Sequence, residues 1–144
     1  ARDAAILVIR TAAFFSPHDP HNFAMAVEHS LREGARFAAA ADYVVTPSYV
    51  GDLVSATLDL VIDGERGIWH LTNGDPVSWL EFGRQVASAL ALDPTRIVPA
   101  CGPDLGWRAK RPRYAALCSS HGRLLPPLAD ALERHAAERL RAAA

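Results

Sequence analysis

The sequence has 144 residues, 50% of them hydrophobic and 22% charged, which is typical of one soluble globular domain. Its net charge of −1 gives no electrostatic reason to expect a nucleic acid or an anionic membrane as partner. The sequence contains neither an apolar run near the roughly 20 residues of a membrane helix nor an opening signal-peptide pattern. With two cysteines and no C-x-x-C spacing, we expect a reduced, cytoplasmic protein whose cysteines are inert.

The first predicted element is a buried strand at the start of the chain. Residues 4–10 read AAILVIR, a near-continuous apolar run with β-branched residues. Such a run is typical of a parallel strand covered on both faces. Because a buried strand of this kind needs neighbours on its edges, we expect residues 1–144 to form a single domain that is a fragment of a larger fold.

A helix and a short strand are expected next. Asn22 or Asp19 is placed to cap the helix, which ends at Gly34. Its predicted apolar face carries Phe23, Ala26, Val27, Ser30 and Leu31. Residues 37–41 predict a short strand.

The central stretch, residues 46–71, predicts a turn, a helix, a tight loop and a buried strand. Ser48 is placed to cap the helix, and Asp52 adds negative charge near its positive end. The predicted apolar stripe is Leu53, Ala56, Thr57, Leu60 and Val61. A helix followed directly by a buried strand at 68–71 is half of a β-α-β unit, which indicates a parallel sheet.

Two more helices are predicted in the second half. Ser78 and Glu81 form an S-x-x-E capping box that starts a helix running through Leu90. Residues 97–98 read as a short strand. The last helix carries Leu128, Leu132, Ala136 and Leu140 on one face.

The mostly irregular stretch 99–127 carries a basic run with an aromatic neighbour. Arg108, Lys110, Arg111 and Arg113 lie within six residues of a loop that contains proline. Guanidinium groups bind phosphate oxygens in pairs, and the neighbouring Trp107 can stack on a base or sugar ring. From the sequence alone, a solvated charged surface is the favoured interpretation of this run.

Known catalytic motifs are absent from the printed sequence. Its glycines form no G-x-x-G-x-x-G or G-x-G-x-x-G loop, and no Tyr is followed four residues later by Lys. Neither G-x-S-x-G nor H-E-x-x-H occurs, and His18 with His21 lacks further ligands at metal-binding spacing. We therefore expect no catalytic residue, cofactor site or metal site in this chain.

Taken in order, the motifs resemble those of the dTDP-4-dehydrorhamnose reductase family of extended short-chain dehydrogenases, over nearly the whole chain. The matching residues are Arg10-Thr11, Asn22-Phe23, Asp42, Thr46-Pro47-Ser48, Gly67 to Asn73, Ser78-Trp79 with Phe82, and Arg111-Pro112 with Tyr114 and Leu117. The resemblance implies an α/β fold, the C-terminal part of a Rossmann-like extended short-chain dehydrogenase with short parallel strands and helices. In that family the glycine-rich loop and the Tyr-x-x-x-Lys pair lie in the N-terminal half.

By this resemblance, the chain is the substrate-binding half of a bacterial reductase of carbohydrate biosynthesis that uses NADPH or NADH. The implied partners are a nucleotide-diphosphate sugar and the N-terminal Rossmann half of the parent chain, with a homodimer left open. The implied substrate-binding residues are Asn22, Thr46, Pro47, Ser48, Trp107, Arg108, Arg111 and Arg113. The chain alone is expected to be inactive.

One segment departs from the family pattern. Where the family continues Arg-Thr with Ser-Trp-x-Tyr, residues 12–15 read AAFF, so Ala13 replaces the Trp and Phe15 the Tyr. The stretch RTAAFFSPHDPHNF also resembles reductase-like modules joined to a glycoside-hydrolase-like domain in bacterial fusion proteins. Three interpretations stay open: the substrate domain of a working reductase, a non-catalytic module that binds a nucleotide sugar, and a module for structural or subunit contact.

Overall fold

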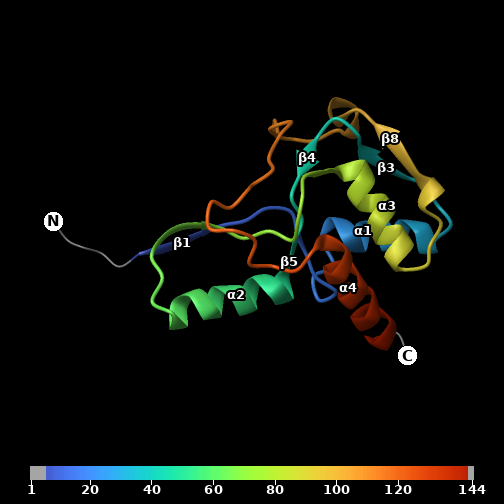
Figure 1. Cartoon of the computed structure of the whole chain (residues 1–144). Helices are drawn as coiled ribbons and strands as arrows, with labels where there is room; N and C mark the ends of the chain where they lie inside the picture. Colours follow the sequence, from blue (N-terminus) through green and yellow to red (C-terminus); the bar gives the residue numbers. More distant parts are fainter. Residues whose placement is uncertain (1–5, 143–144) are drawn as a thin grey trace.

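The computed structural model describes residues 6–142, so residues 4 and 5 of the first predicted strand lie outside the described part. Figure 1 shows two regions side by side. One contains the strand β1 (Leu7–Arg10) and the helix α2 (Val50–Ile62), and the other contains the remaining helices. Each region has its own cluster of buried apolar residues.

Within residues 6–142 the strands pair two by two, and three of the four pairs are parallel. The parallel pairs are β1 with β6 (Gly67–His70), β2 (Phe14–Phe15) with β5 (Ser48–Tyr49), and β3 (Phe37–Ala40) with β8 (Ile97–Ala100). The antiparallel pair is β4 (Val44–Val45) with β7 (Val77–Ser78). The predicted parallel arrangement of α/β type is therefore confirmed.

The β1–β6 sheet has one covered face in this chain. Leu7 and Ile9 pack with Trp69 and with residues of α2 in the smaller apolar cluster. On the opposite face, Val8 and its partner Ile68 are 40% and 51% exposed. The expectation that the first strand is covered on both faces is wrong for the described residues. On that second face the segment 118–121 reaches His70, whose Nδ1 lies 2.8 Å from the Cys118 carbonyl oxygen, but Val8 stays exposed.

Helix α1 (Phe23–Arg32) begins where the sequence predicts. Asn22 is its N-cap, and the Asn22 Oδ1 accepts a hydrogen bond from the Met25 N–H at 3.1 Å. The buried face consists of Ala24, Val27, Glu28 and Leu31. Ala26, which was expected on that face, is exposed, because the helix is rotated to bring Glu28 inward.

Helix α2 differs from its prediction at both ends. Its N-cap is Tyr49 and no side chain caps it. Ser48 instead belongs to β5, where its hydroxyl accepts from Thr11 at 2.9 Å, so the predicted cap is wrong. At the other end Val61 is 59% exposed, whereas Leu60 is buried against β6.

The larger cluster lies among α1, α3 and α4. Helix α3 (Trp79–Ala89) begins at Ser78, whose hydroxyl accepts from the Glu81 N–H at 3.0 Å, as the capping box predicts. Helix α4 (Leu128–Ala142) buries Leu132 and Ala136 in this cluster. Leu140 was expected on that face and is 58% exposed, because the helix extends past the core there.

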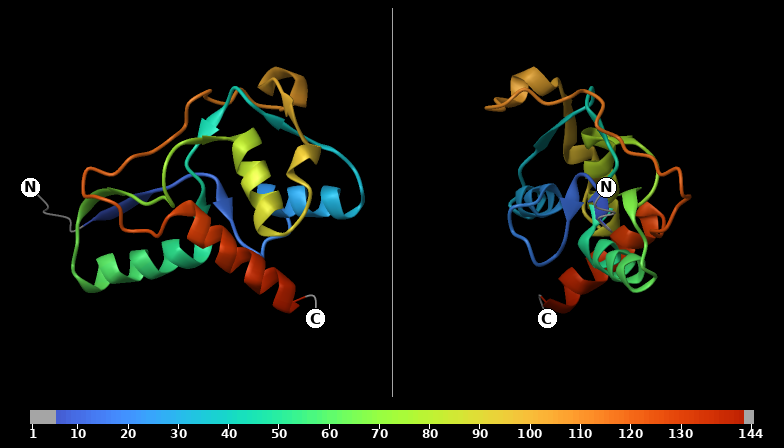
Figure 2. Two further views of the ribbon diagram at one scale, coloured as in Figure 1. Left: turned by 45° about the vertical axis from the view of Figure 1, so that its right-hand side comes forward. Right: turned by 90° about the vertical axis from the view of Figure 1, so that its left-hand side faces the viewer.

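Two 3-10 turns, η1 (Pro94–Arg96) and η2 (Gly102–Leu105), flank β8. Figure 2 shows η2 at the upper edge of the molecule, away from α4 (red), and the orange segment after it running back to the start of α4. The basic run follows η2 directly and therefore lies at this edge. Among residues 6–142, no helix has the length and apolar character needed to cross a membrane.

Candidate substrate-binding site

The local structure after β8 fixes the position of Trp107. The Asp42 Oδ1 accepts a hydrogen bond from the Gly102 N–H at 2.9 Å and so caps the start of η2. Gly106 then ends the turn in the left-handed region, at φ 66°, a conformation that costs a glycine little. This reversal places Trp107 against Tyr43.

Three side chains form a stacked group at this edge. The Tyr43 ring meets the Trp107 ring edge-on, with centroids 4.8 Å apart and an interplanar angle of 88°. The guanidinium carbon of Arg111 lies 5.2 Å from the centroid of the Trp107 ring, within cation–π range. The backbone of Gly102 approaches Tyr43 so closely that a Cβ there would lie 2.6 Å from the Tyr43 Cδ2. The group therefore requires glycine at position 102.

Trp107 and Arg111 line two adjacent cavities. The first has a volume of about 410 Å³ and is lined largely by apolar groups. Its other lining residues are His21, Phe23, Phe37, Ala38, Ala39, Ala40, Trp79 and Leu105. The second cavity has a volume of about 470 Å³ and is lined by basic residues beside Tyr43. It brings together Arg108, Lys110, Arg111 and Arg113.

The two cavities offer complementary chemistry. Aromatic faces in the first can pack on a planar heterocycle, and the small side chains of β3 leave room for one. The second carries exposed cations, which bind phosphate oxygens by charge-assisted hydrogen bonds. Arg111 belongs to both, so the structure brings together the four predicted residues Trp107, Arg108, Arg111 and Arg113.

The other four predicted residues lie elsewhere and are bonded within the chain. The Asn22 Nδ2 donates to the carbonyl oxygens of Ser16 and Asp19, both at 2.7 Å. The Thr46 Oγ1 accepts from the Leu117 N–H at 3.1 Å. The carbonyl oxygen of Pro47 and the hydroxyl of Ser48 also have partners within the chain. These four residues are buried and line neither of the two cavities, so ligand contact by them stays a prediction.

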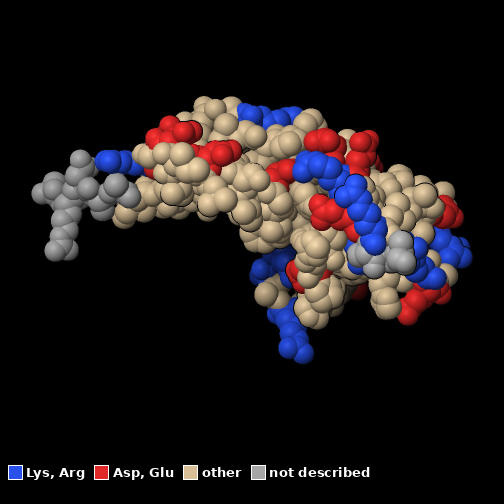
Figure 3. Space-filling view, turned by 90° about the horizontal axis from the view of Figure 1, so that it is seen from below, with Lys and Arg blue, Asp and Glu red and all other residues tan. Residues whose placement is uncertain are grey.

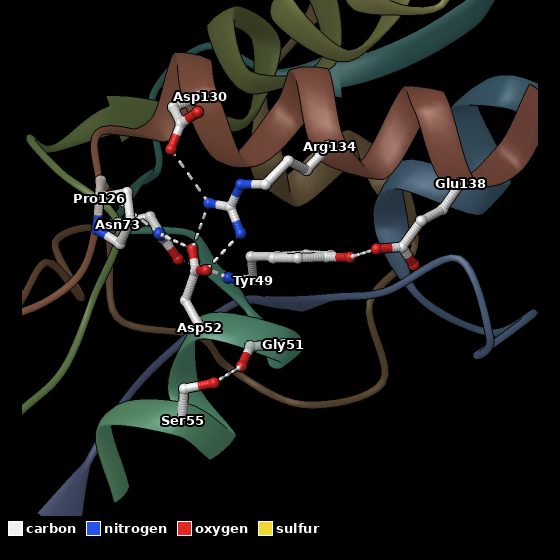
Figure 4. A network of polar contacts seen from close by, with 9 residues as sticks. All are labelled: Tyr49, Gly51, Asp52, Ser55, Asn73, Pro126, Asp130, Arg134 and Glu138. Carbon is white, nitrogen blue, oxygen red and sulfur yellow. Dashed lines mark hydrogen bonds and ion pairs between the residues drawn. The ribbon is translucent and has the colours of Figure 1, made fainter. Parts of the chain in front are cut away.

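A polar network joins α4 to the end of β5 and the first turn of α2 (Figure 4). Asp52 accepts two hydrogen bonds from the Arg134 guanidinium, and the Arg134 Nη2 lies 2.8 Å from the Asp52 Oδ2. Asn73, which is fully buried, donates to the same oxygen at 2.6 Å. The Tyr49 hydroxyl donates to the Glu138 Oε1 at 2.7 Å. The hydrogen bond to Asp52 raises the pKa of Arg134, so the guanidinium keeps its positive charge.

This network and the aromatic lining were not predicted from the sequence. Asp52 was assigned to the helix dipole, since its partner Arg134 lies 82 residues away. Phe23 was expected on a helix face and Phe37 in a strand, but neither they nor Tyr43 gave a signal for a ligand site, because that role depends on which segments meet in space. Trp79 is the lining residue that could have been recognised, because an aromatic side chain directly after the Ser78 cap can stack on a base or sugar ring.

Comparison with known proteins assigns this fold to a family. A family model described as "RmlD substrate binding domain" matches residues 1–128. The chain belongs to the RmlD substrate binding domain family.

Relatives agree with this assignment at the levels of sequence and structure. A dTDP-4-dehydrorhamnose reductase of Mycolicibacterium smegmatis is 35% identical over 127 residues, which cover 85% of this chain and 38% of the relative. A dTDP-4-dehydrorhamnose reductase of Bacillus anthracis, solved in complex with NADP, superimposes with a TM-score of 0.83 at 25% identity. That match covers 92% of this chain and 48% of the other. The chain thus spans less than half the length of these relatives.

The predicted fold class is confirmed, since the RmlD-type domain shares its fold with Rossmann-like extended short-chain dehydrogenases. A dTDP-glucose 4,6-dehydratase of Bacillus anthracis, 14% identical, superimposes with a TM-score of 0.73 and shows the fold alone. In this RmlD domain Phe15 is fully buried, with ring centroids 5.4 Å from Tyr49 and 5.5 Å from Phe82. Phe15, which stands where the family pattern has Tyr, therefore belongs to the apolar core.

Proposed function

We propose that this RmlD-type domain binds a nucleotide-diphosphate sugar across the two adjacent cavities. The observation that carries the proposal is the position of Arg111, packed on Trp107 and shared by an aromatic cavity and a basic one. A nucleotide sugar carries a planar base and, beyond the ribose, a diphosphate, which matches this order of aromatic and cationic groups.

The comparisons support the nucleotide class. The Mycolicibacterium smegmatis relative is a dTDP-4-dehydrorhamnose reductase, and a Streptomyces antibioticus relative, 30% identical over 126 residues, is a probable dTDP-sugar 4-ketoreductase. We therefore take dTDP as the probe for the site. In this proposal the domain belongs to a cytoplasmic protein, and the sugar is a 4-keto sugar of the dTDP series.

The proposal includes a parent protein whose other half binds NADPH or NADH and supplies the catalytic Tyr and Lys. Uncovered apolar surface supports a large partner for this domain. Figure 3 shows a mostly uncharged surface on the side that contains α2. Its exposed apolar residues are Val54, Leu58, Val61 and Ile62, which are 51%, 55%, 59% and 81% exposed. An N-terminal Rossmann half of the same chain would cover such a surface, and residues 1–144 would form the substrate-binding half.

The test is titration calorimetry with dTDP on the parent protein and its Arg111→Ala variant. Loss of one charge-assisted interaction of about 1.5–3 kcal/mol predicts a Kd roughly ten to more than a hundred times weaker. Arg111→Lys should recover part of this affinity, since it restores a point charge without the planar fork. Arg66→Ala, in the exposed loop between α2 and β6, is the matched control and should bind as the parent does.

A folded Arg111→Ala variant that binds dTDP with parental affinity would contradict the proposal, and the basic run would then be a solvated surface. The isolated 144-residue chain serves as a second arm. We expect it not to oxidise NADPH with a 4-keto sugar nucleotide, and turnover above a buffer control would refute that part.

A further inference from the structure

A histidine lies in the core beneath α4. His135 is 1% exposed, and its ring packs edge-on against Phe15 of β2 and Tyr49 of β5, at centroid distances of 5.6 and 6.4 Å. Within residues 6–142, neither ring nitrogen has a hydrogen-bond partner. Buried polar atoms are normally hydrogen-bonded, and leaving one without a partner costs free energy. That cost is lowest for a neutral, weakly polar ring, so we infer that His135 is neutral in this site.

The charged groups around His135 are already engaged. Glu28 on α1 accepts hydrogen bonds from the Nε atoms of Arg32 and Arg139, both at 2.8 Å. Glu138 on α4 accepts from the Tyr49 hydroxyl, and its Oε2 lies 3.6 Å from the Nε2 of the exposed His18. The negative charges of Glu28 and Glu138 favour a proton on His135 and the Arg139 guanidinium opposes it, but burial of the ring is the largest effect and disfavours the proton.

The remaining neighbours offer no acceptor for a proton on His135. Helix α3 contributes Phe82 and Val86 to the same core, and β2 contributes Phe15. A protonated ring would thus be a cation without a hydrogen-bonded partner in an apolar environment, which is among the costliest groups to bury. Release of α4 would return the ring to water.

Several contacts depend on the docking of α4. Arg134 binds Asp52 on α2, and Glu138 binds Tyr49 on β5. The carbonyl oxygen of Pro126, two residues before α4, accepts from the Asn73 Nδ2 at 3.0 Å. Undocking of α4 would therefore break the network of Figure 4 and expose the apolar cluster beneath it.

We propose that His135 makes the docking of the C-terminal helix α4 sensitive to pH, so that the neutral ring allows docking and a proton on the ring releases the helix. This property is independent of the proposed ligand. Histidine suits such a role because its charge changes between pH 5 and 8.

The direction of the effect follows from burial, which lowers the pKa of His135 below its usual 6.5. The unfolded chain then binds a proton at a higher pH than the folded chain does. Stability from this residue is fully present above about pH 6.5 and is lost as the pH falls toward the lower folded-state pKa. Glu28 remains ionised at these pH values, because burial, which alone would raise its pKa, is outweighed by the hydrogen bonds from Arg139 and Arg32 that lower it.

The test measures urea unfolding of the 144-residue chain between pH 7.5 and 5. As the pH falls over this range, we expect the unfolding equilibrium constant of the wild type to rise. The rise should exceed that of His135→Phe by up to about tenfold for each pH unit. His29→Gln is the control, because His29 is exposed on α1, and it should follow the wild type. Equal pH dependence in the wild type and His135→Phe would overturn the proposal.

Hydrogen exchange on the wild type provides a measurement that needs no variant. After correction for the intrinsic rate, amides of α4 should lose protection below pH 6.5 while those of α1 and α3 keep it. Uniform loss across the three helices, or unchanged protection of α4 down to pH 5, would overturn the proposal.

Discussion

Asn73 is the buried centre of the network that joins the two halves of the fold, and Asn73→Ala tests its role. The side-chain Oδ1 accepts from the Tyr49 N–H at 2.7 Å. The Nδ2 donates to the Asp52 carboxylate at 2.6 Å and to the Pro126 carbonyl at 3.0 Å. Alanine would remove all three bonds and leave a buried backbone N–H without its partner.

The magnitude follows from these contacts. A neutral hydrogen bond contributes about 1 kcal/mol and one to a charged group about 1.5–3 kcal/mol, so we expect a loss of roughly 3–5 kcal/mol. Such a loss is a large fraction of the roughly 5–15 kcal/mol that stabilises a typical domain. Urea unfolding followed by circular dichroism measures it at pH 7.

Gln85→Ala is the control for this experiment. Gln85 makes one exposed side-chain bond, to Glu81 at 3.3 Å, and its replacement should change stability by less than about 0.5 kcal/mol. Asn73→Asp is a second variant, because it keeps the acceptor for Tyr49 but places a carboxylate beside Asp52. If Asn73→Ala unfolds at the same urea concentration as Gln85→Ala, the reasoning from buried hydrogen bonds is refuted.

Two further predictions concern Gly102 and Glu28. Gly102→Ala should displace Tyr43 and weaken dTDP binding at least several-fold in calorimetry, while unchanged affinity would show that the stacked group does not form the site. Burial by itself raises the pKa of Glu28, but hydrogen bonds from Arg139 and Arg32 outweigh it and lower the pKa below 4.5. The stabilisation from Glu28 should therefore be present above about pH 4.5 and be lost at lower pH, so the difference in urea midpoint between wild type and Glu28→Gln should shrink below that pH. A constant difference from pH 7 to pH 3 would contradict the ion-pair assignment.

Local signals in the sequence predicted the helices and two of their caps. Asn22 and Ser78 are recognisable because a cap depends on the next three residues alone. Ser48 shows the limit of reading caps from local sequence. Its hydroxyl accepts from Thr11 and donates to the Leu71 carbonyl, so it does not cap α2. Caps compete with tertiary partners that a local pattern does not contain.

The candidate site was predictable only where its residues are neighbours in the sequence. The basic run and Trp107 are neighbours in sequence, so a loop that turns back on itself brings them together. The aromatic residues opposite, Phe23 and Trp79, come from two different helices. Their meeting depends on the packing of α1 on α3, for which the sequence carries no short-range signal.

The pairing of the strands has a consequence for how the chain folds. Leu7 of β1 pairs with Gly67 and Phe37 of β3 pairs with Ile97, so about 60 residues separate the partners in each of these sheets. Closing such long loops loses chain entropy before any strand contact forms. We expect refolding on a timescale of milliseconds to seconds, with helices forming first. On the ribosome, β1 would remain without its partner until β6 has been synthesised.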